Sequence, residues 1–235
     1  METYREFLDR INTFEKKEIV FGGERFECSP SVALKVAEDN TFRNFYGDTV
    51  VFDLPGVVKE KLAEYVDQLY AAVPPCFCER LVPHTFHATL HDLSNAPTLS
   101  SVAEETFRNE LKVVEIKDEI RKLAGNGIRF KSKYIFNMVN TSLVLGLYPE
   151  GESNYERLMK LYSVFDGVKK LPYPLTPHIT LAYYNVNGFD GRAAEGLADA
   201  VNKINAELDL SVCVRYLYYQ KFTSMNNYID VIELN

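Results

Sequence analysis

The sequence lacks the patterns that mark several large protein classes. No apolar run approaches the ~20 residues that span a bilayer. The first 21 residues carry charges throughout, without the apolar core of a secretory signal peptide. Basic residues are outnumbered, with 26 Lys and Arg against 33 Asp and Glu, and the formal net charge is -7. Because affinity for a phosphate backbone comes from clustered basic side chains, we expect a cytoplasmic protein without membrane contact or a long nucleic-acid footprint.

Cysteine and histidine are both scarce, with four of each. Cys76 and Cys78 are separated by one residue, which is not the C-x-x-C spacing of a redox or zinc site, and no second pair accompanies them. His84, His87 and His91 form the one metal-like cluster, but no H-E-x-x-H pattern contains them. We therefore expect reduced thiols, no bound metal and no cofactor. A small anionic ligand in a local pocket stays compatible with this composition.

The hydrophobic periodicity indicates a globular α+β chain. With 46% hydrophobic residues over 235 positions, it suits one large domain or two small lobes that share a core. Helical spacing is found over 3–17, 57–72, 102–124, 155–165 and 192–208. Strand patterns are found over 49–54, 84–91, 128–138, 142–149, 211–222, 228–234 and around residue 178, and residues 31–54 read as a hairpin with an Asp-Asn turn.

Part of this order is repeated. The segment TVVFDLP (49–55) is followed by a helix, a loop and HATL (87–90), and TSLVLGLYP (141–149) is followed by a helix, a loop and HITL (178–181). Such a repeat predicts two β-α-β lobes packed about an approximate two-fold axis. Each lobe would then deliver one H-x-T strand to a shared cleft.

The two H-x-T strands carry the candidate chemistry. Residues i and i+2 of a strand point to the same face, so His87 projects with Thr89 and His178 with Thr180. Two imidazoles can supply the base and the acid of phosphodiester cleavage near neutral pH without a metal. The threonine hydroxyls can donate to the phosphoryl oxygens, where negative charge develops. A single His-x-Thr-Leu is weak evidence, since half-buried structural pairs are common, but two copies at equivalent places favour catalysis or phosphate binding.

These residues resemble the two-histidine (2H) phosphoesterase superfamily, whose members carry two H-x-[ST] motifs, one in each pseudo-symmetric lobe. The resemblance covers roughly residues 45 to 235, and the stretch FYGDTVVF is similar to an uncharacterised bacterial branch. It implies an antiparallel sheet in each lobe, outer helices and a metal-free groove between the lobes. It also implies that His87 and His178 are the acid/base pair and that Thr89 and Thr180 bind the phosphate. Residues 1–45 are expected to be an N-terminal extension, a helix plus a hairpin strand, packed on the bilobal domain 46–235.

For several other residues near the motifs, the sequence allows more than one interpretation. By alternation Tyr184 shares the face of His178 and is a candidate for stacking on a base, or else a core aromatic. We expect His84 in loop structure and His91 at the surface or rim. Four basic residues lie on strands that could border the groove, or could simply be solvated: Lys131, Lys133, Arg215 and Lys221.

The sequence thus favours a metal-independent phosphodiesterase acting on the cyclic phosphate, of the 2′,3′ type, of a small nucleotide or short RNA end. The alternatives are a 2′-5′ RNA ligase that runs the same chemistry in reverse and a nucleotide-binding module that does not turn over.

Overall fold

The computed structural model describes residues 2–125 and 127–235. Within these ranges, eight strands form one antiparallel sheet in the order β10-β9-β2-β3-β6-β5-β4-β8. In chain order they are β2 (Tyr46–Asp53), β3 (His87–Ala96), β4 (Ile128–Met138), β5 (Ser142–Pro149), β6 (His178–Tyr183), β8 (Ser211–Val214), β9 (Leu217–Ser224) and β10 (Asn227–Glu233). The helices are α1 (Tyr4–Phe14), α2 (Gly56–Ala72), α3 (Leu99–Ala124), α4 (Glu152–Asp166) and α5 (Gly191–Glu207).

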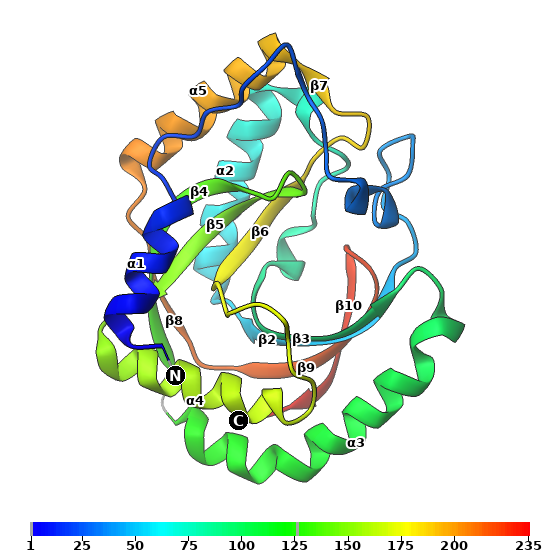
Figure 1. Ribbon diagram of the computed structural model, residues 1–235, viewed down its shortest axis with the longest axis vertical. Helices are drawn as coiled ribbons and strands as arrows, with labels where there is room; N and C mark the ends of the chain where they lie inside the picture. Colours follow the sequence, from blue (N-terminus) through cyan, green and yellow to red (C-terminus); the bar gives the residue numbers. More distant parts are fainter. Residues whose placement is uncertain (1, 126) are drawn as a thin grey trace.

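The two halves of this sheet are related by an approximate two-fold axis between β3 and β6 (Figure 1). The order β3-β2-β9-β10 outward on one side matches β6-β5-β4-β8 on the other. Each half has a β-α-β-α course along the chain, β2-α2-β3-α3 and then β5-α4-β6-α5. The helix contacts are symmetric as well. Helix α2 of the first half contacts α5 of the second, and α4 of the second half contacts α3 of the first. The predicted α+β fold with two pseudo-symmetric lobes is confirmed.

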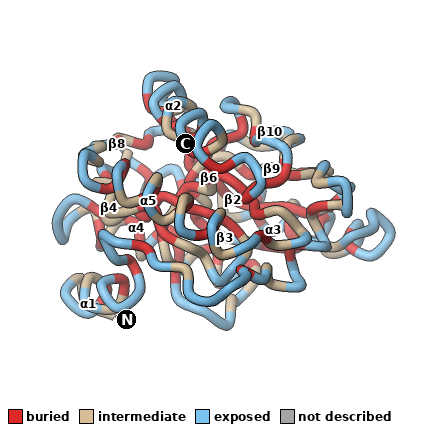
Figure 2. Tube along the Cα trace, turned by 90° about the horizontal axis from the view of Figure 1, so that it is seen from above, coloured by how far each residue is buried: buried red, intermediate tan, exposed pale blue. Residues whose placement is uncertain are grey.

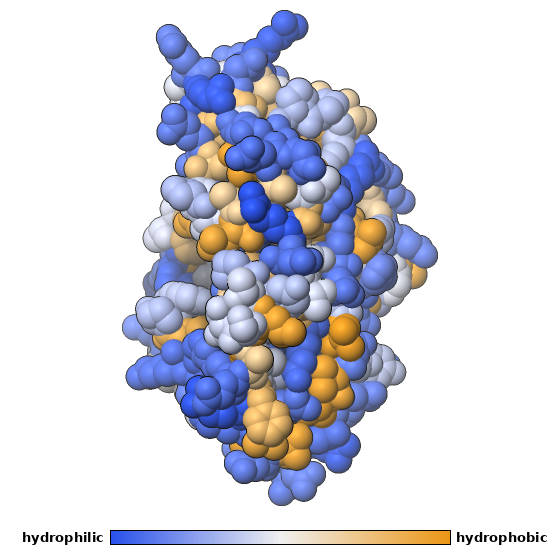
Figure 3. Space-filling view, turned by 90° about the vertical axis from the view of Figure 1, so that its right-hand side faces the viewer, coloured by the Kyte–Doolittle hydropathy of each residue, from blue (hydrophilic) through white to orange (hydrophobic). Residues whose placement is uncertain are grey.

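The core lies between the strands and the helices. Figure 2 shows buried residues gathered along the strands and exposed residues on the outer helices. The helices bury one stripe each, such as Val58, Leu62, Val66 and Leu69 of α2, which recur every three or four residues. Hydrophilic residues cover most of the face shown in Figure 3. Among the described residues, no helix is long and apolar enough to cross a membrane.

The N-terminal segment, residues 2–45, touches both lobes. Helix α1 packs on α4, where Phe7 and Tyr155 lie with ring centroids 5.3 Å apart. Strand β1 (Arg25–Phe26) then pairs with β7 (Phe189–Asp190). At the end of the segment, the Phe45 amide donates to the Thr223 carbonyl of β9 in the first lobe, at 2.9 Å. The segment therefore crosses from one lobe to the other.

Two predicted strands are wrong in detail. Residues Pro30–Leu34 form a 3₁₀ helix instead of a hairpin arm, because Ser29 caps the amide of Ser31 and Pro30 occupies the first helical position. The hairpin shrinks to a single bridge between Val36 and Phe42 around the predicted Asp-Asn turn. The predicted strand 211–222 is two strands, β8 on β4 and β9 on β2, in opposite halves of the sheet. Periodicity alone could not show that the chain changes lobe in the middle of an alternating run.

Glu15, just beyond α1, is buried without a partner for its carboxyl group. Its side chain lies against Gly146 of β5, where a Cβ atom would collide with the carboxyl group. The residue is 2% exposed, and neither carboxyl oxygen has a hydrogen-bond partner within residues 2–125 and 127–235. Burial raises the pKa of Glu15 to about 8, although Lys133 and Arg10 act in the opposite direction. Glu15 is therefore protonated at neutral pH in the folded protein.

This burial predicts that the Glu15→Gln variant is more stable than the wild type, and increasingly so as pH rises. Between pH 4.5 and about 8 the folded protein holds a proton that the unfolded chain has lost, so the stability of the wild type falls across this window. Glutamine does not titrate, so the variant avoids this loss of stability. The loss amounts to ~1.4 kcal/mol for each unit by which folding raises the pKa of Glu15. Urea denaturation at pH 5 and pH 8 measures the difference. The exposed Glu18→Gln is the control, and an equal gain at both pH values for Glu15→Gln contradicts the burial argument.

Candidate active site

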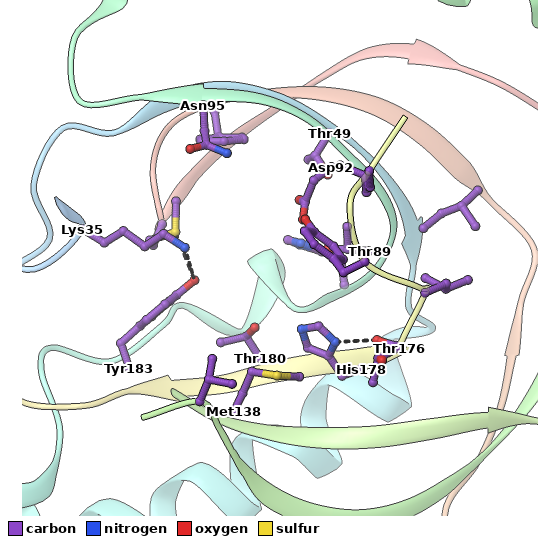
Figure 4. A pocket seen from close by; sticks show the side chains of 18 of the residues that line it. Lys35, Thr49, Thr89, Asp92, Asn95, Met138, Thr176, His178, Thr180 and Tyr183 are labelled. Atoms are coloured by element: carbon purple, nitrogen blue, oxygen red, sulfur yellow. Dashed lines mark hydrogen bonds between the residues drawn. The ribbon is translucent and has the colours of Figure 1, made fainter. Parts of the chain in front are cut away.

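A cavity of about 660 Å³ lies between the two lobes. Both H-x-T motifs line it, together with residues of β2, β9 and β10, of the loop 171–176 and of the N-terminal segment. Figure 4 shows His178 and Thr180 rising from β6 toward the cavity and Thr89 and Asp92 reaching in from the other side. The four residues that sequence analysis singled out, His87, Thr89, His178 and Thr180, are thus brought to one cavity.

Their convergence follows from a contact between the motif centres. Ala88 of β3 pairs with Ile179 of β6 in antiparallel register. Both of these middle residues are buried, at 1% and 0% exposure, so their neighbours on either side face the cavity. An antiparallel register around this pair sets His87 beside Thr180 and Thr89 beside His178. Each histidine is therefore opposite the threonine of the other motif.

Both imidazoles are held by the same backbone contact. Nδ1 of His87 lies 2.7 Å from the carbonyl oxygen of Thr85, and Nδ1 of His178 lies 2.7 Å from the carbonyl oxygen of Thr176. A carbonyl oxygen only accepts hydrogen bonds, so Nδ1 must carry the proton in each ring. In the neutral tautomer the proton-accepting nitrogen is then Nε2. Each ring is left with one nitrogen for proton transfer.

The cavity disfavours charged imidazoles. Desolvation lowers the pKa of His87 to about 4, and the nearby His178 lowers it further, while the Thr85 carbonyl and Asp92 act in the opposite direction. Desolvation also lowers the pKa of His178, against the Thr176 carbonyl and Asp92. Both side chains are partly open to the cavity. Both rings are therefore neutral at pH 7 before an anion binds.

Two bulges in β3 determine which residues follow His87 and Thr89 on the cavity face. The register steps from Val51–Thr89 to Val50–His91 and from Thr49–Asp92 to Asp48–Ser94, which leaves one extra residue in β3 each time. Each extra residue reverses the alternation. As a result Asp92 and Asn95 line the cavity, and sequence analysis missed both.

The sequence predicted His91 at the surface or rim, and because of the first bulge this prediction is wrong. It is 1% exposed and packs on the helix side of the sheet, with its ring centroid 4.9 Å from that of Tyr162. Its Nε2 lies 3.3 Å from the carboxylate of Asp166. His84 lies in an exposed 3₁₀ turn, Pro83–Thr85, as predicted for loop structure. Neither residue lines the cavity.

A bulge in β6 decides between the two interpretations of Tyr184, in favour of a core aromatic. The register with β5 steps from Val144–Thr180 to Leu143–Ala182, so Leu181 is extra and the alternation reverses after it. Tyr183 lines the cavity, whereas Tyr184 is 0% exposed in an aromatic cluster with Phe26 and Phe77. Tyr184 therefore has no surface on which a base could stack.

The cations of the cavity come from the N-terminal segment. Lys35 and Arg10 line it, with Phe45 and Phe14 as their apolar neighbours. Arg10 is engaged: it pairs with Glu2 at 2.8 Å and donates to the Leu175 carbonyl at 2.8 Å. The candidates from the strand pattern, Lys131, Lys133, Arg215 and Lys221, lie outside the cavity lining. No group of three or more His, Cys, Asp or Glu suited to a metal ion is found across residues 2–125 and 127–235.

Comparison with solved structures shows the same fold in other proteins, although no protein-family model and no curated protein matches the sequence. A conserved protein of unknown function, ATU0111 from Agrobacterium tumefaciens, superposes with a TM-score of 0.59 at 11% identity over 86% of this chain and 90% of its own. TT0787 of Thermus thermophilus gives 0.50 at 15% identity over 80% and 96%. E. coli LigT complexed with ATP gives 0.49 at 13% identity over 81% and 96%. The fold that the 2H resemblance implies is confirmed.

The position of Asp92 predicts that the Asp92→Asn variant titrates its cavity imidazoles at lower pH. The Asp92 charge raises the pKa of both His87 and His178, so its removal adds to the effect of desolvation. NMR titration of the ring carbons should give pKa values below 6.5 in the wild type and lower values in the variant. Asp118→Asn on α3, where the side chain is 88% exposed, removes the same charge far from these rings and serves as control. Unchanged or raised values in Asp92→Asn contradict this role.

Proposed function

We propose that this protein is a 2H phosphoesterase that hydrolyses the cyclic phosphate, of the 2′,3′ type, of a nucleotide or RNA end by acid/base catalysis with His87 and His178. The observation that carries the proposal is the symmetric delivery of two H-x-T motifs to one cavity, with Nδ1 of each imidazole held by a backbone carbonyl. Each ring then offers Nε2 to a reacting group in the space between the lobes.

The reaction needs one imidazole in each protonation state. Nε2 of the neutral ring takes a proton from water as the water oxygen attacks phosphorus. The bond from phosphorus to one ribose oxygen breaks, and that oxygen receives the proton of the other, protonated ring, which leaves a phosphomonoester. Since both rings are neutral in the free cavity, the anionic phosphate itself must raise the pKa of one of them. The Asp92 carboxylate also raises the pKa of both imidazoles and so favours the protonated form.

The hydroxyls of Thr89 and Thr180 complete the site. They lie on the same faces as the imidazoles and line the same cavity. Negative charge on the non-bridging oxygens increases as the fifth bond to phosphorus forms, and hydroxyl donors on both sides stabilise it. The two threonines are therefore assigned as phosphate ligands.

The walls of the cavity favour a small substrate. The N-terminal segment contributes Arg10 and Phe14 from α1 and Lys35 and Phe45 from residues 35–45 to its lining. A volume of about 660 Å³ lies within the range of small-molecule sites. A nucleotide or a short cyclic end suits this space better than a continuous RNA strand, and the net charge of -7 agrees.

The test is hydrolysis of a panel of 2′,3′-cyclic nucleotides and cyclic-ended oligonucleotides, with and without EDTA. We expect turnover that survives EDTA, because the imidazoles supply base and acid. His87→Ala and His178→Ala should each lower kcat on the order of 10²- to 10⁴-fold, the usual worth of a general acid or base.

His84→Ala is the matched control, since this exposed histidine lies three residues before His87 and outside the cavity lining. Full activity in either cavity-histidine variant would sink the proposal, as would activity that EDTA abolishes and Zn²⁺ restores. Joining of cyclic ends to 5′-hydroxyl ends would identify a ligase. Binding without turnover would identify a nucleotide-binding module.

Thr89→Val and Thr180→Val test the phosphate ligands. Valine keeps the β-branched shape that suits a strand and removes only the hydroxyl. A lost donor to developing charge costs ~10²- to 10³-fold in kcat in a well-organised site, and we expect ~10-fold or more for each variant here. Thermal unfolding checks that the fold is unchanged. Wild-type rates in both variants exclude the threonines from the reaction.

A further inference from the structure

Lys35 is held inside the cavity by aromatic side chains. It follows the 3₁₀ helix Pro30–Leu34 and belongs to the segment that crosses between the lobes. Its Nζ lies 5.4 Å from the ring centroid of Phe45 and 5.1 Å from that of Tyr183. The Tyr183 hydroxyl is 3.5 Å from the same nitrogen. Cation–π contacts on two sides fix the position of the ammonium group.

This ammonium group has no counter-ion of its own. No carboxylate lies within 4.0 Å of Lys35 Nζ among residues 2–125 and 127–235, whereas Arg10, which also lines the cavity, pairs with Glu2. Asp92 acts on Lys35 from further away and raises its pKa, but desolvation is the larger effect and lowers it. A desolvated cation without a partner is costly unless something compensates it. An anionic group of a ligand would do so.

The place of Lys35 differs from that of the reacting phosphate. In Figure 4 the Lys35–Tyr183 pair lies at one side of the cavity, and Thr180 stands between Tyr183 and His178. Tyr183 is at the end of β6 and His178 at its start, yet Lys35 is near enough to His178 for its charge to lower the pKa of that imidazole. Lys35 and His178 therefore face different parts of a bound molecule.

We infer that Lys35 is a specificity-determining residue that binds a second anionic group of the substrate, to one side of the phosphodiester between His87 and His178. The inference rests on the proposed function and names its substrate class: a cyclic phosphate that also carries a terminal phosphate, such as a nucleoside 2′,3′-cyclic phosphate with a 5′-phosphate. Phe45 and Tyr183 position the ammonium group, and the ligand phosphate supplies the counter-ion.

The experiment compares binding of 3′-AMP and of adenosine 3′,5′-bisphosphate, two product analogues that differ only in the 5′-phosphate. Calorimetry is run on the wild type, on Lys35→Met and on Lys35→Gln. We expect the wild type to prefer the bisphosphate ~10- to 100-fold, the range of one hydrogen-bonded charge pair. Both variants should lose most of this preference. Methionine keeps the unbranched stem, and thermal unfolding checks each variant.

Lys61→Met is the matched control. Lys61 also lies 5.1 Å from a tyrosine ring centroid, that of Tyr65, but on the outer helix α2 and outside the cavity lining. Its variant removes the same charge and the same kind of contact, so it should keep the wild-type preference. Equal affinity of the wild type for both ligands overturns the inference, and so does an equal loss for both ligands in Lys35→Met.

Turnover separates this inference from the proposed function. Hydrolysis of cyclic nucleotides with no preference for a 5′-phosphate leaves the proposed function standing and overturns the role of Lys35. A bisphosphate preference that depends on Lys35, in a protein that hydrolyses no cyclic phosphate, supports the role of Lys35 and overturns the proposed reaction. Absence of both binding and turnover overturns the two together.

Discussion

The antiparallel contact between β3 and β6 is the constraint on which the site depends. Ala88 and Ile179 pair at the point where the two lobes meet, and no other pair between these strands is in ladder register among the described residues. A shift of this register by one residue would turn the histidines and threonines toward the buried helix side. Burial of Ala88 and Ile179 opposes such a shift, because the shift would also bring these apolar side chains into the cavity. Packing on one face of the sheet thus fixes chemistry on the other.

The backbone before each motif completes this arrangement. The carbonyls of Thr85 and Thr176 stand two residues before their histidines and fix the same tautomer in both rings. Arg10 of α1 donates to the Leu175 carbonyl and to the Thr176 side chain, at 2.8 and 3.2 Å. A helix outside the repeated lobes therefore holds the loop that orients His178. The equivalent position in the first lobe is held locally, where the Thr85 hydroxyl donates to the Val82 carbonyl at 2.7 Å.

Sequence reasoning located the elements and the motif residues because both depend on local periodicity. The repeat placed the H-x-T strands, and the i, i+2 rule placed His87 with Thr89 and His178 with Thr180 on the cavity side. The same rule failed beyond the motifs. Bulges at Leu90, Leu93 and Leu181 reverse the alternation, so Asp92 and Tyr183 enter the cavity while His91 and Tyr184 leave it. A bulge arises from pairing with a neighbouring strand, which one strand's own sequence does not reveal.

The position of Lys35 in the cavity could not be predicted from the sequence, for a different reason. Its position depends on a 3₁₀ helix and on a segment that crosses between lobes far apart in sequence, and its aromatic neighbours come from residue 45 and from β6. The strand lysines looked better placed, yet Lys131 and Lys221 pair with glutamates on the outside. Lys35 is informative because burial in the cavity wall, and not exposure to solvent, surrounds a cation that has no carboxylate within hydrogen-bonding reach among the described residues. The local field of such a cation favours a small anion, whereas the net charge of -7 disfavours an extended polyanion.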